Sequence, residues 1–262
     1  MPLITLTTDF GTGDGNVGVM KGIIYSVQPE ARIVDLSHEI EPQNIHQAAW
    51  VLQRQVFFFP DSTVHIVVVD PGVGTSRRPI AARVGTQCVV GPDNGVFTPL
   101  FERAEVEGWP LEIVHTDNPD YWLSEISMVF HGRDIFSPVG AHLASGAALT
   151  DVGAPIKDET RIPWPKPQRS AHGFHAQIMH IDRFGNLLSN VHRDELKGQA
   201  IRNVKVAGVT VEHVVTTFGD RRAGDLVALF SSTGFVLVAE VNGSAARKVG
   251  AKVGGLFSVR LR

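Results

Sequence analysis

Three carboxylates in the first half of the chain lie where a β-rich run of residues ends or in the glycine-rich loop that follows it. Asp9 and Asp14 belong to residues 7–16 (TTDFGTGDGN), between an apolar run and an amphipathic stretch. Open α/β sheets bind ligands at the carboxyl ends of their strands, and carboxylates there can hold a ribose diol or an ammonium group. We therefore predict that Asp9 binds a ligand. Asp14 fits a ligand contact and an ordinary loop position equally well.

The third carboxylate, Asp70, directly follows the most hydrophobic run and opens residues 70–78 (DPGVGTSRR). The spacing brings two guanidinium groups, Arg77 and Arg78, within one loop of this carboxylate. The alternative interpretation is a turn residue before Pro71 together with two solvated arginines. The position of Asp70 at a strand end favours a functional role.

One histidine differs from the other ten in its surroundings. His131 lies in the polar, glycine-containing sequence FHGRD, just before an apolar stretch that is typical of a helix. A single histidine is more often structural than catalytic, and only its polar, glycine-containing loop sets His131 apart as a candidate. Asp134 in the same sequence is predicted to cap the helix.

A fourth polar sequence lies in the second half, at residues 181–187 (IDRFGNL). There Phe184 could stack on a base, Asn186 could donate to and accept from its edge, and Asp182 could hold a cation. The alternative is a tight hairpin with Phe184 in the core, which the residues alone favour. Residues 230–235, which include Ser232, and residues 242–245 are predicted strand turns that could present hydroxyls and backbone amides.

The elements that must position these residues differ between the two halves. Residues 3–8, 16–27, 32–36, 44–58 and 64–69 alternate β-rich and helical patterns, which predicts an α/β fold with a mostly parallel sheet covered by helices on both faces. Beyond a proline-rich connector the runs are short and β-rich, which predicts a smaller all-β, barrel-like domain. We place the boundaries at residues 1–162 for the α/β domain, 163–172 for the linker and 173–262 for the β domain.

Composition limits the classes of protein to which the chain can belong. Of 262 residues, 43% are hydrophobic and 19% charged, and the net charge is -3 without clustered basic residues. These values predict a cytoplasmic globular protein with neither nucleic acid nor membrane as a partner. The single cysteine, Cys88, excludes an intramolecular disulfide and is predicted to be a small core residue.

Five short motifs occur in order along the chain. They are TDFG (residues 8–11), VDPGVG (69–74), GPDNG (91–95), FHGRD (130–134) and DRFGN (182–186). Together they resemble those of the adenosine-forming S-adenosylmethionine hydrolases (SAM hydroxide adenosyltransferases), which are relatives of fluorinase and chlorinase. The resemblance covers essentially the whole chain.

The resemblance implies a homotrimer of two-domain subunits, with S-adenosylmethionine held between the large domain of one subunit and the small domain of its neighbour. It implies a water-activating trio at Asp70, Arg77 and His131, in which the choice of Arg77 over Arg78 rests on spacing. Asp9 would hold the ribose hydroxyls. The other implied substrate contacts are Phe184, Phe218, Asn186, Asn242 and Ala245 around the adenine, and Asp14, Asp182 and Ser232 at the methionine end.

The implied reaction is hydrolysis by in-line attack of an oriented water on the ribose 5′ carbon. A sulfonium leaves as a neutral thioether, so the chemistry requires no acid, metal or cofactor, and His131 and Asp70 are the candidate proton acceptors. Three alternatives remain: a halogenase on the same scaffold, a metal-dependent phosphoesterase using Asp9, Asp14, Asp70 and His131, and a non-catalytic nucleoside-binding protein. Residues 83–92 lack the long insertion associated with the fluorinase branch.

Overall fold

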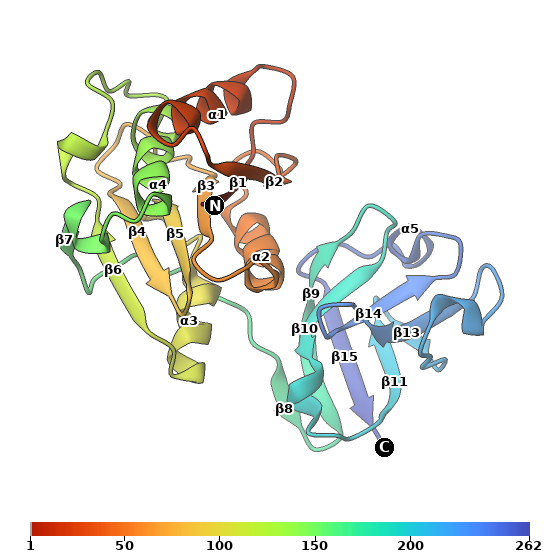
Figure 1. Cartoon of the computed structure of the whole chain (residues 1–262). Helices are drawn as coiled ribbons and strands as arrows, with labels where there is room; N and C mark the ends of the chain where they lie inside the picture. The colour runs from red at the N-terminus through yellow and green to blue at the C-terminus, as the bar shows by residue number, and fades with distance from the viewer. Residues whose placement is uncertain (1) are drawn as a thin grey trace. The chain divides into compact units, whose positions relative to one another are not determined.

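The computed structural model describes residues 2–262 and places a seven-stranded sheet at the centre of the N-terminal part (Figure 1). The strand order is β2-β1-β3-β5-β4-β6-β7. β2, β1, β3 and β5 are parallel neighbours, whereas β4 runs antiparallel to both β5 and β6. The prediction of a mostly parallel sheet is therefore confirmed. The strands are β1 (Leu3–Thr8), β2 (Arg32–Ser37), β3 (Val64–Val68), β4 (Pro79–Val84), β5 (Gln87–Pro92), β6 (Leu111–His115) and β7 (Ala154–Pro155).

Helices cover both faces of this sheet, which confirms the predicted α/β/α sandwich. One face packs against α1 and α4 through Met20 and Val139, and the other against α2 and α3 through Leu52 and Phe101. The helices are α1 (Asn16–Val27), α2 (Ile45–Gln55), α3 (Thr98–Glu107) and α4 (Ser137–Ala144), with a π-helical turn at Gly132–Phe136 and shorter 3-10 turns at Val56–Phe58, Pro119–Tyr121 and Leu149–Asp151.

Strand β3 is the central buried strand that its composition predicts. All five of its residues are buried, and successive side chains alternate between the two cores, with Ile66 on one face and Val67 on the other. A strand with helices on both faces has no solvated side, so a continuous apolar run suits it better than an alternating pattern. This burial fixes the carboxyl end of β3 and therefore the position of the residues that follow it.

β3 also buries a histidine whose protonation opposes folding. The ring of His65 is completely buried and lies 2.7 Å from Thr5 Oγ1 and 3.3 Å from Gln87 Oε1. Loss of hydration lowers its pKa to about 4, although the contact with Gln87 acts in the opposite direction. The unfolded chain, with an ordinary histidine pKa, therefore takes up a proton at higher pH than the folded chain does.

We expect the free energy of unfolding to fall as the pH drops from about 6.5 towards 4, with His65 contributing a total loss of about 3 kcal/mol. Below that range its contribution stays constant because both states are protonated. Urea unfolding followed by tryptophan fluorescence at several pH values, on the wild type and on His65→Gln, isolates this contribution. Equal pH slopes for the two proteins would contradict it.

The chain divides into two compact units, the first ending at Pro163 and the second spanning Trp164–Arg262. The second unit holds an eight-stranded antiparallel sheet around a single core that includes Val204, Val238 and Phe257, in agreement with the predicted barrel-like domain. Its strands are β8 (Gln168–Ser170), β9 (Gly173–Ile181), β10 (Leu187–His192), β11 (Ile201–Val206), β12 (Val209–Val211), β13 (Leu226–Phe230), β14 (Phe235–Glu240) and β15 (Leu256–Leu261), with helix α5 (Ala245–Val249) and 3-10 turns at Arg193–Leu196 and Phe218–Asp220.

Part of the predicted linker 163–172 is strand. β8 pairs antiparallel with β9, with Gln168 opposite His175. The proline-rich composition ends at Pro167, so every residue of β8 has a backbone N–H and can join a ladder. Among residues 2–262, no helix is long and apolar enough to cross a membrane.

Candidate active site

The carboxyl ends of β1 and β3 lie side by side, because the two strands are parallel neighbours with Thr8 opposite Val68. Asp9 and Asp70 follow these strand ends and therefore emerge at the same edge of the sheet. Asp9 is held by the backbone N–H of Gln43, which donates to its Oδ2 at 2.7 Å. Asp14, further along the same loop, is exposed.

Arg77 joins the other two residues of the predicted trio. Its Nε donates to Asp70 Oδ1 at 3.0 Å, its Nη2 donates to Asp70 Oδ2, and the same Nη2 lies 3.0 Å from His131 Nδ1. The guanidinium also packs over the Phe136 ring, 5.3 Å from its centroid. The side chains of Arg77 and Asp70 are only 6% and 4% exposed. The structure thus gathers Asp70, Arg77 and His131 into one buried cluster.

The neighbouring arginine points to other partners. Arg78 donates to Asp93 Oδ2 from both Nε and Nη2, at 3.0 and 2.7 Å, and to Asp158 Oδ1 at 2.9 Å. The structure therefore places Arg77, which spacing alone suggested, beside Asp70 and His131, and places Arg78 elsewhere.

The contact with Arg77 also determines which nitrogen of His131 carries the proton. A guanidinium has only donors, so His131 Nδ1 must accept the hydrogen bond, and the ring is neutral with its proton on Nε2. Burial lowers the pKa of His131, and the positive charge of Arg77 lowers it further, against the opposing charges of Asp70 and Asp134. His131 is therefore a neutral hydrogen-bond donor at neutral pH, whereas Asp70 is the acceptor of the cluster. In the sequence analysis both are candidate proton acceptors, and this geometry favours Asp70.

A π-helical turn positions His131. The turn Gly132–Phe136 directly follows the histidine, and a Cβ atom added at Gly132 would lie 3.0 Å from Val68 Cγ1, so the turn packs closely on the end of β3. Such turns are frequent at functional sites. Asp134 does not cap a helix as predicted. Its buried carboxylate lies within the turn, where Oδ2 accepts from the backbone N–H of Ser127 at 2.8 Å.

The loop before His131 lies directly against the loop that follows Asp70. Gly74 has a positive φ of 73°, and a Cβ atom added there would lie 2.1 Å from the Met128 carbonyl oxygen. Met128 and Val129 are 61% and 78% exposed. The loop before His131 therefore exposes two apolar side chains next to the loop that carries Arg77.

In the C-terminal unit, three of the predicted residues form one tight turn between β9 and β10. Asp182 Oδ1 accepts from the backbone N–H groups of Phe184 and Asn186, both at 2.9 Å, and its Oδ2 accepts from Asn186 Nδ2 at 2.8 Å. This is the hairpin that the sequence analysis offered as the alternative, but Phe184 does not enter the core. It is 76% exposed, so its ring is available to stack on a ligand.

The start of α5 lies beside this turn. The N–H of Ala246 donates to the Gly185 carbonyl at 2.9 Å, and a Cβ atom added at Gly185 would lie 2.0 Å from Ser244 Oγ. Asn242 is exposed with a φ of 54°, whereas Ala245 is buried. These contacts bring residues 242–245 and 182–186 together, 60 residues apart in the chain.

The remaining two predicted residues lie in other loops. The loop with Phe218, which is 44% exposed, leads to β13, whose first residue Leu226 pairs with Glu240 at the end of β14. Ser232 lies in the turn before β14, at the end where Phe235 pairs with His192. Within one chain the structure therefore does not bring Ser232 to Asp182.

No group of three or more His, Cys, Asp or Glu side chains between residues 2 and 262 lies where it could hold a metal ion. At the carboxyl edge of the sheet, the cation that neutralises Asp70 is Arg77.

Comparison with known proteins decides the family. Residues 4–153 match the model of the SAM hydroxide adenosyltransferase N-terminal domain, and residues 176–257 match that of the C-terminal domain. The chain belongs to the SAM hydroxide adenosyltransferase family. The resemblance inferred from the five sequence motifs is confirmed.

Relatives in this family match the chain over nearly their whole length. An (R)-S-adenosyl-L-methionine hydrolase from Salinispora tropica is 38% identical and is covered over 97% of its length, with 98% of this chain aligned. A fluorinase from Actinoplanes sp. is 28% identical, over 91% of this chain and 90% of its own. A crystal structure of an uncharacterized conserved protein from Thermotoga maritima superposes with a TM-score of 0.90 at 35% identity, covering 98% of this chain and 99% of that one.

Proposed function

We propose that this protein hydrolyses S-adenosyl-L-methionine to adenosine and L-methionine. The observation that carries the proposal is the buried cluster in which Arg77 joins Asp70 to a neutral His131 at the carboxyl end of β3. The relatives named as S-adenosyl-L-methionine hydrolases support the same reaction.

The chemistry assigns a separate role to each member of the cluster. A water oxygen attacks the ribose 5′ carbon while the carbon–sulfur bond breaks, and the sulfonium sulfur takes the bonding pair and leaves as the neutral thioether of methionine. The new oxygen carries an excess proton, which a carboxylate can accept because a protonated alcohol is a much stronger acid. Asp70 accepts this proton, and Arg77 holds Asp70 in place. The Nε2 proton of His131 orients the water oxygen.

The same proposal assigns substrate contacts outside the cluster. Asp9 binds the ribose hydroxyls from the end of β1. Phe184, Phe218, Asn186, Asn242 and Ala245 surround the adenine, and Asp14 and Asp182 face the methionine end. The support for Ser232 is weaker, because it lies at the other end of its sheet from Asp182. The homotrimer, with each site shared between neighbouring subunits, and the cytoplasmic location stay predictions from the sequence.

Incubation of the purified protein with S-adenosylmethionine and a chelator, with and without chloride, tests the proposal. We expect adenosine and methionine in equal amounts by chromatography, with no effect of the chelator. A halogenated nucleoside would establish the halogenase instead, and chelator-sensitive activity would point to metal chemistry. Tight binding of adenosine without turnover would favour a binding protein.

Two features of the cluster disfavour the rival enzymes. A halide anion in this cluster would be repelled by the negative charge of Asp70. It would also lose its hydration on entering a buried site, and both effects oppose its binding. A divalent cation would have to compete with the guanidinium of Arg77 for the same carboxylate oxygens. Water, which can donate to Asp70 and accept from His131, fits the cluster better than either ion.

The pH dependence of turnover follows from the state of His131. Its pKa lies below the ordinary value of 6.5, so the neutral form persists through neutral pH, and protonation at lower pH abolishes the hydrogen bond from Arg77. We expect kcat/KM to be constant across neutral pH and to fall on the acid side, with a midpoint below 6.5. Rates measured in constant-ionic-strength buffers check this, and a midpoint above 6.5 would contradict it.

A further inference from the structure

The motif GPDNG at residues 91–95 has no role in the function proposed so far. The order of the strands nevertheless places it beside the loop of residues 70–78, which carries Asp70 and Arg77. β5 lies between β3 and β4 in the sheet. The loop of residues 70–78, which connects β3 to β4, must therefore pass over the carboxyl end of β5. Asp93 and Asn94 are the first two residues after that strand end.

Each of these two residues holds one end of the loop. Asn94 Nδ2 donates to the carbonyl of Val69, the residue immediately before Asp70, at 2.9 Å. The backbone N–H of Asp93 donates to the carbonyl of Arg78, the residue immediately after Arg77, at 2.9 Å. The carboxylate of Asp93 also binds the Arg78 guanidinium in the two hydrogen bonds given above.

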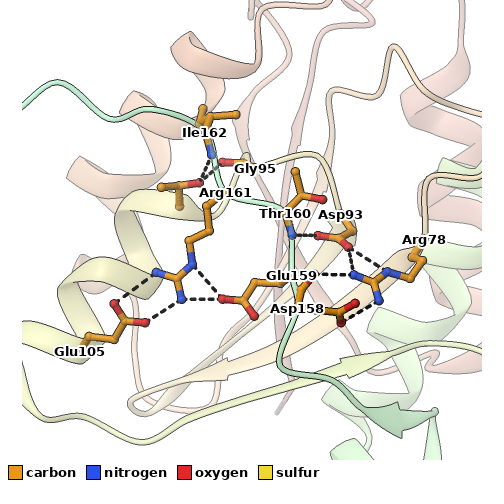
Figure 2. Close-up of polar contacts among 10 residues, drawn as sticks. Arg78, Asp93, Gly95, Glu105, Asp158, Glu159, Thr160, Arg161 and Ile162 are labelled. Atoms are coloured by element: carbon orange, nitrogen blue, oxygen red, sulfur yellow. Dashed lines mark hydrogen bonds and ion pairs between the residues drawn. The ribbon is translucent and has the colours of Figure 1, made fainter.

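The other oxygen of Asp93 anchors a second segment. The backbone N–H of Thr160 donates to Asp93 Oδ1 at 2.6 Å, and the N–H of Ile162 donates to Thr98 Oγ1 at 3.0 Å. Figure 2 shows this irregular segment, residues 158–162, lying beside Asp93 with Arg78 on one side and Arg161 on the other. Asp93 is only 6% exposed, so its carboxylate is fixed from both sides.

Resting on the function proposed above, we propose that Asp93 and Asn94 are positioning residues for the reaction, holding the two ends of the loop so that Asp70 and Arg77 meet each other and His131. Neither residue touches the cluster itself. Their effect passes through Val69 and Arg78, which adjoin Asp70 and Arg77 in the chain. An error of about 1 Å in the position of a reacting group can cost two orders of magnitude in rate.

Two variants and two matched controls test this role. Asn94→Ala removes the hydrogen bond to Val69, and Asp93→Asn keeps the size of the side chain but removes the charge that binds Arg78. The controls are Asp158→Asn, which removes the exposed partner of the same arginine, and Glu105→Gln, which weakens the ion pair of Arg161 further along the same segment. All four are measured as full-length protein.

We expect kcat for S-adenosylmethionine to fall about 10- to 100-fold in both variants, with KM changed less than about threefold, and to be unchanged in the controls. A second readout is the pKa of His131, obtained by NMR titration of the imidazole signal that is missing from His131→Gln. Arg77 lowers this pKa, whereas the charges of Asp70 and Asp134 raise it. Displacement of Arg77 is therefore expected to move the pKa towards its ordinary value.

Wild-type kcat and an unmoved His131 titration in both variants would overturn the positioning role. If Asn94→Ala does not fold, the milder Asp93→Asn decides by the same two readouts. A wild type that does not hydrolyse S-adenosylmethionine would instead refute the proposed function. The titration would still decide whether Asp93 and Asn94 hold Arg77 against His131, because it requires no turnover.

Discussion

Replacement of Asp70 by asparagine is expected to lower kcat for S-adenosylmethionine by about 10²- to 10⁴-fold, which is the usual contribution of a positioned acid–base group. Asparagine occupies the same volume, but its carboxamide cannot take the proton that the attacking water releases. The substitution also removes the negative charge that pairs with the Arg77 guanidinium. KM is expected to change much less, because Asp70 contacts the nucleophile and not the bulk of the substrate.

Chromatography of adenosine formed over time, with a range of substrate concentrations, gives kcat and KM separately. Glu159→Gln is the matched control, since it neutralises a carboxylate of similarly low exposure that pairs with an arginine away from the cluster. Asp70→Asn that retains more than about a tenth of kcat would contradict the assigned role. If the same assay showed that His131→Gln had lost turnover while Asp70→Asn had not, His131 would be the proton acceptor.

The alternation of β-rich and helical runs was sufficient to predict the N-terminal sheet. A strand that is buried on both faces, such as β3, consists almost entirely of apolar residues, and this is visible in the sequence. Asp9 and Asp70 could be placed for a related reason, since any residue after a parallel strand emerges at the same edge of the sheet. The resemblance to a family implied an arginine in the trio, but the choice of Arg77 over Arg78 rested only on its spacing from Asp70. The geometry adds the tautomer of His131, which depends on a contact between residues 54 positions apart.

Other parts of the site depend on strand order, which local sequence does not encode. Asn94 reaches Val69 only because β5 inserts between β3 and β4. The separation of Ser232 from Asp182 also follows from the arrangement of the strands. β10 and β14 are antiparallel neighbours, so the turn before β10 meets the loop after β14, and the turn before β14 must lie at the opposite end. Motif spacing along the chain carries no information about this.

The second large effect is on stability. Replacement of Arg77 by methionine is expected to lower the free energy of unfolding by about 3–5 kcal/mol, because it leaves the carboxylate of Asp70 buried without a partner. At 4% exposure, that side chain regains little hydration from bulk solvent. Methionine approximates the aliphatic part of arginine, so the packing against Phe136 is largely retained. At low temperature, where the variant is expected to remain folded, turnover is still expected to be lost.

The double variant Asp70→Asn/Arg77→Met separates the two consequences of that change. With both charges removed, no buried ion remains unpaired, so most of the lost stability should return, as it does when a buried ion pair is replaced as a unit. Turnover should stay lost, because the proton acceptor is absent. Urea unfolding of the wild type, both single variants and the double variant gives the coupling free energy directly. A single-variant loss below about 1 kcal/mol, the range of solvated surface pairs, would mean that water reaches Asp70 freely. In that case the cluster could not orient one water against a substrate.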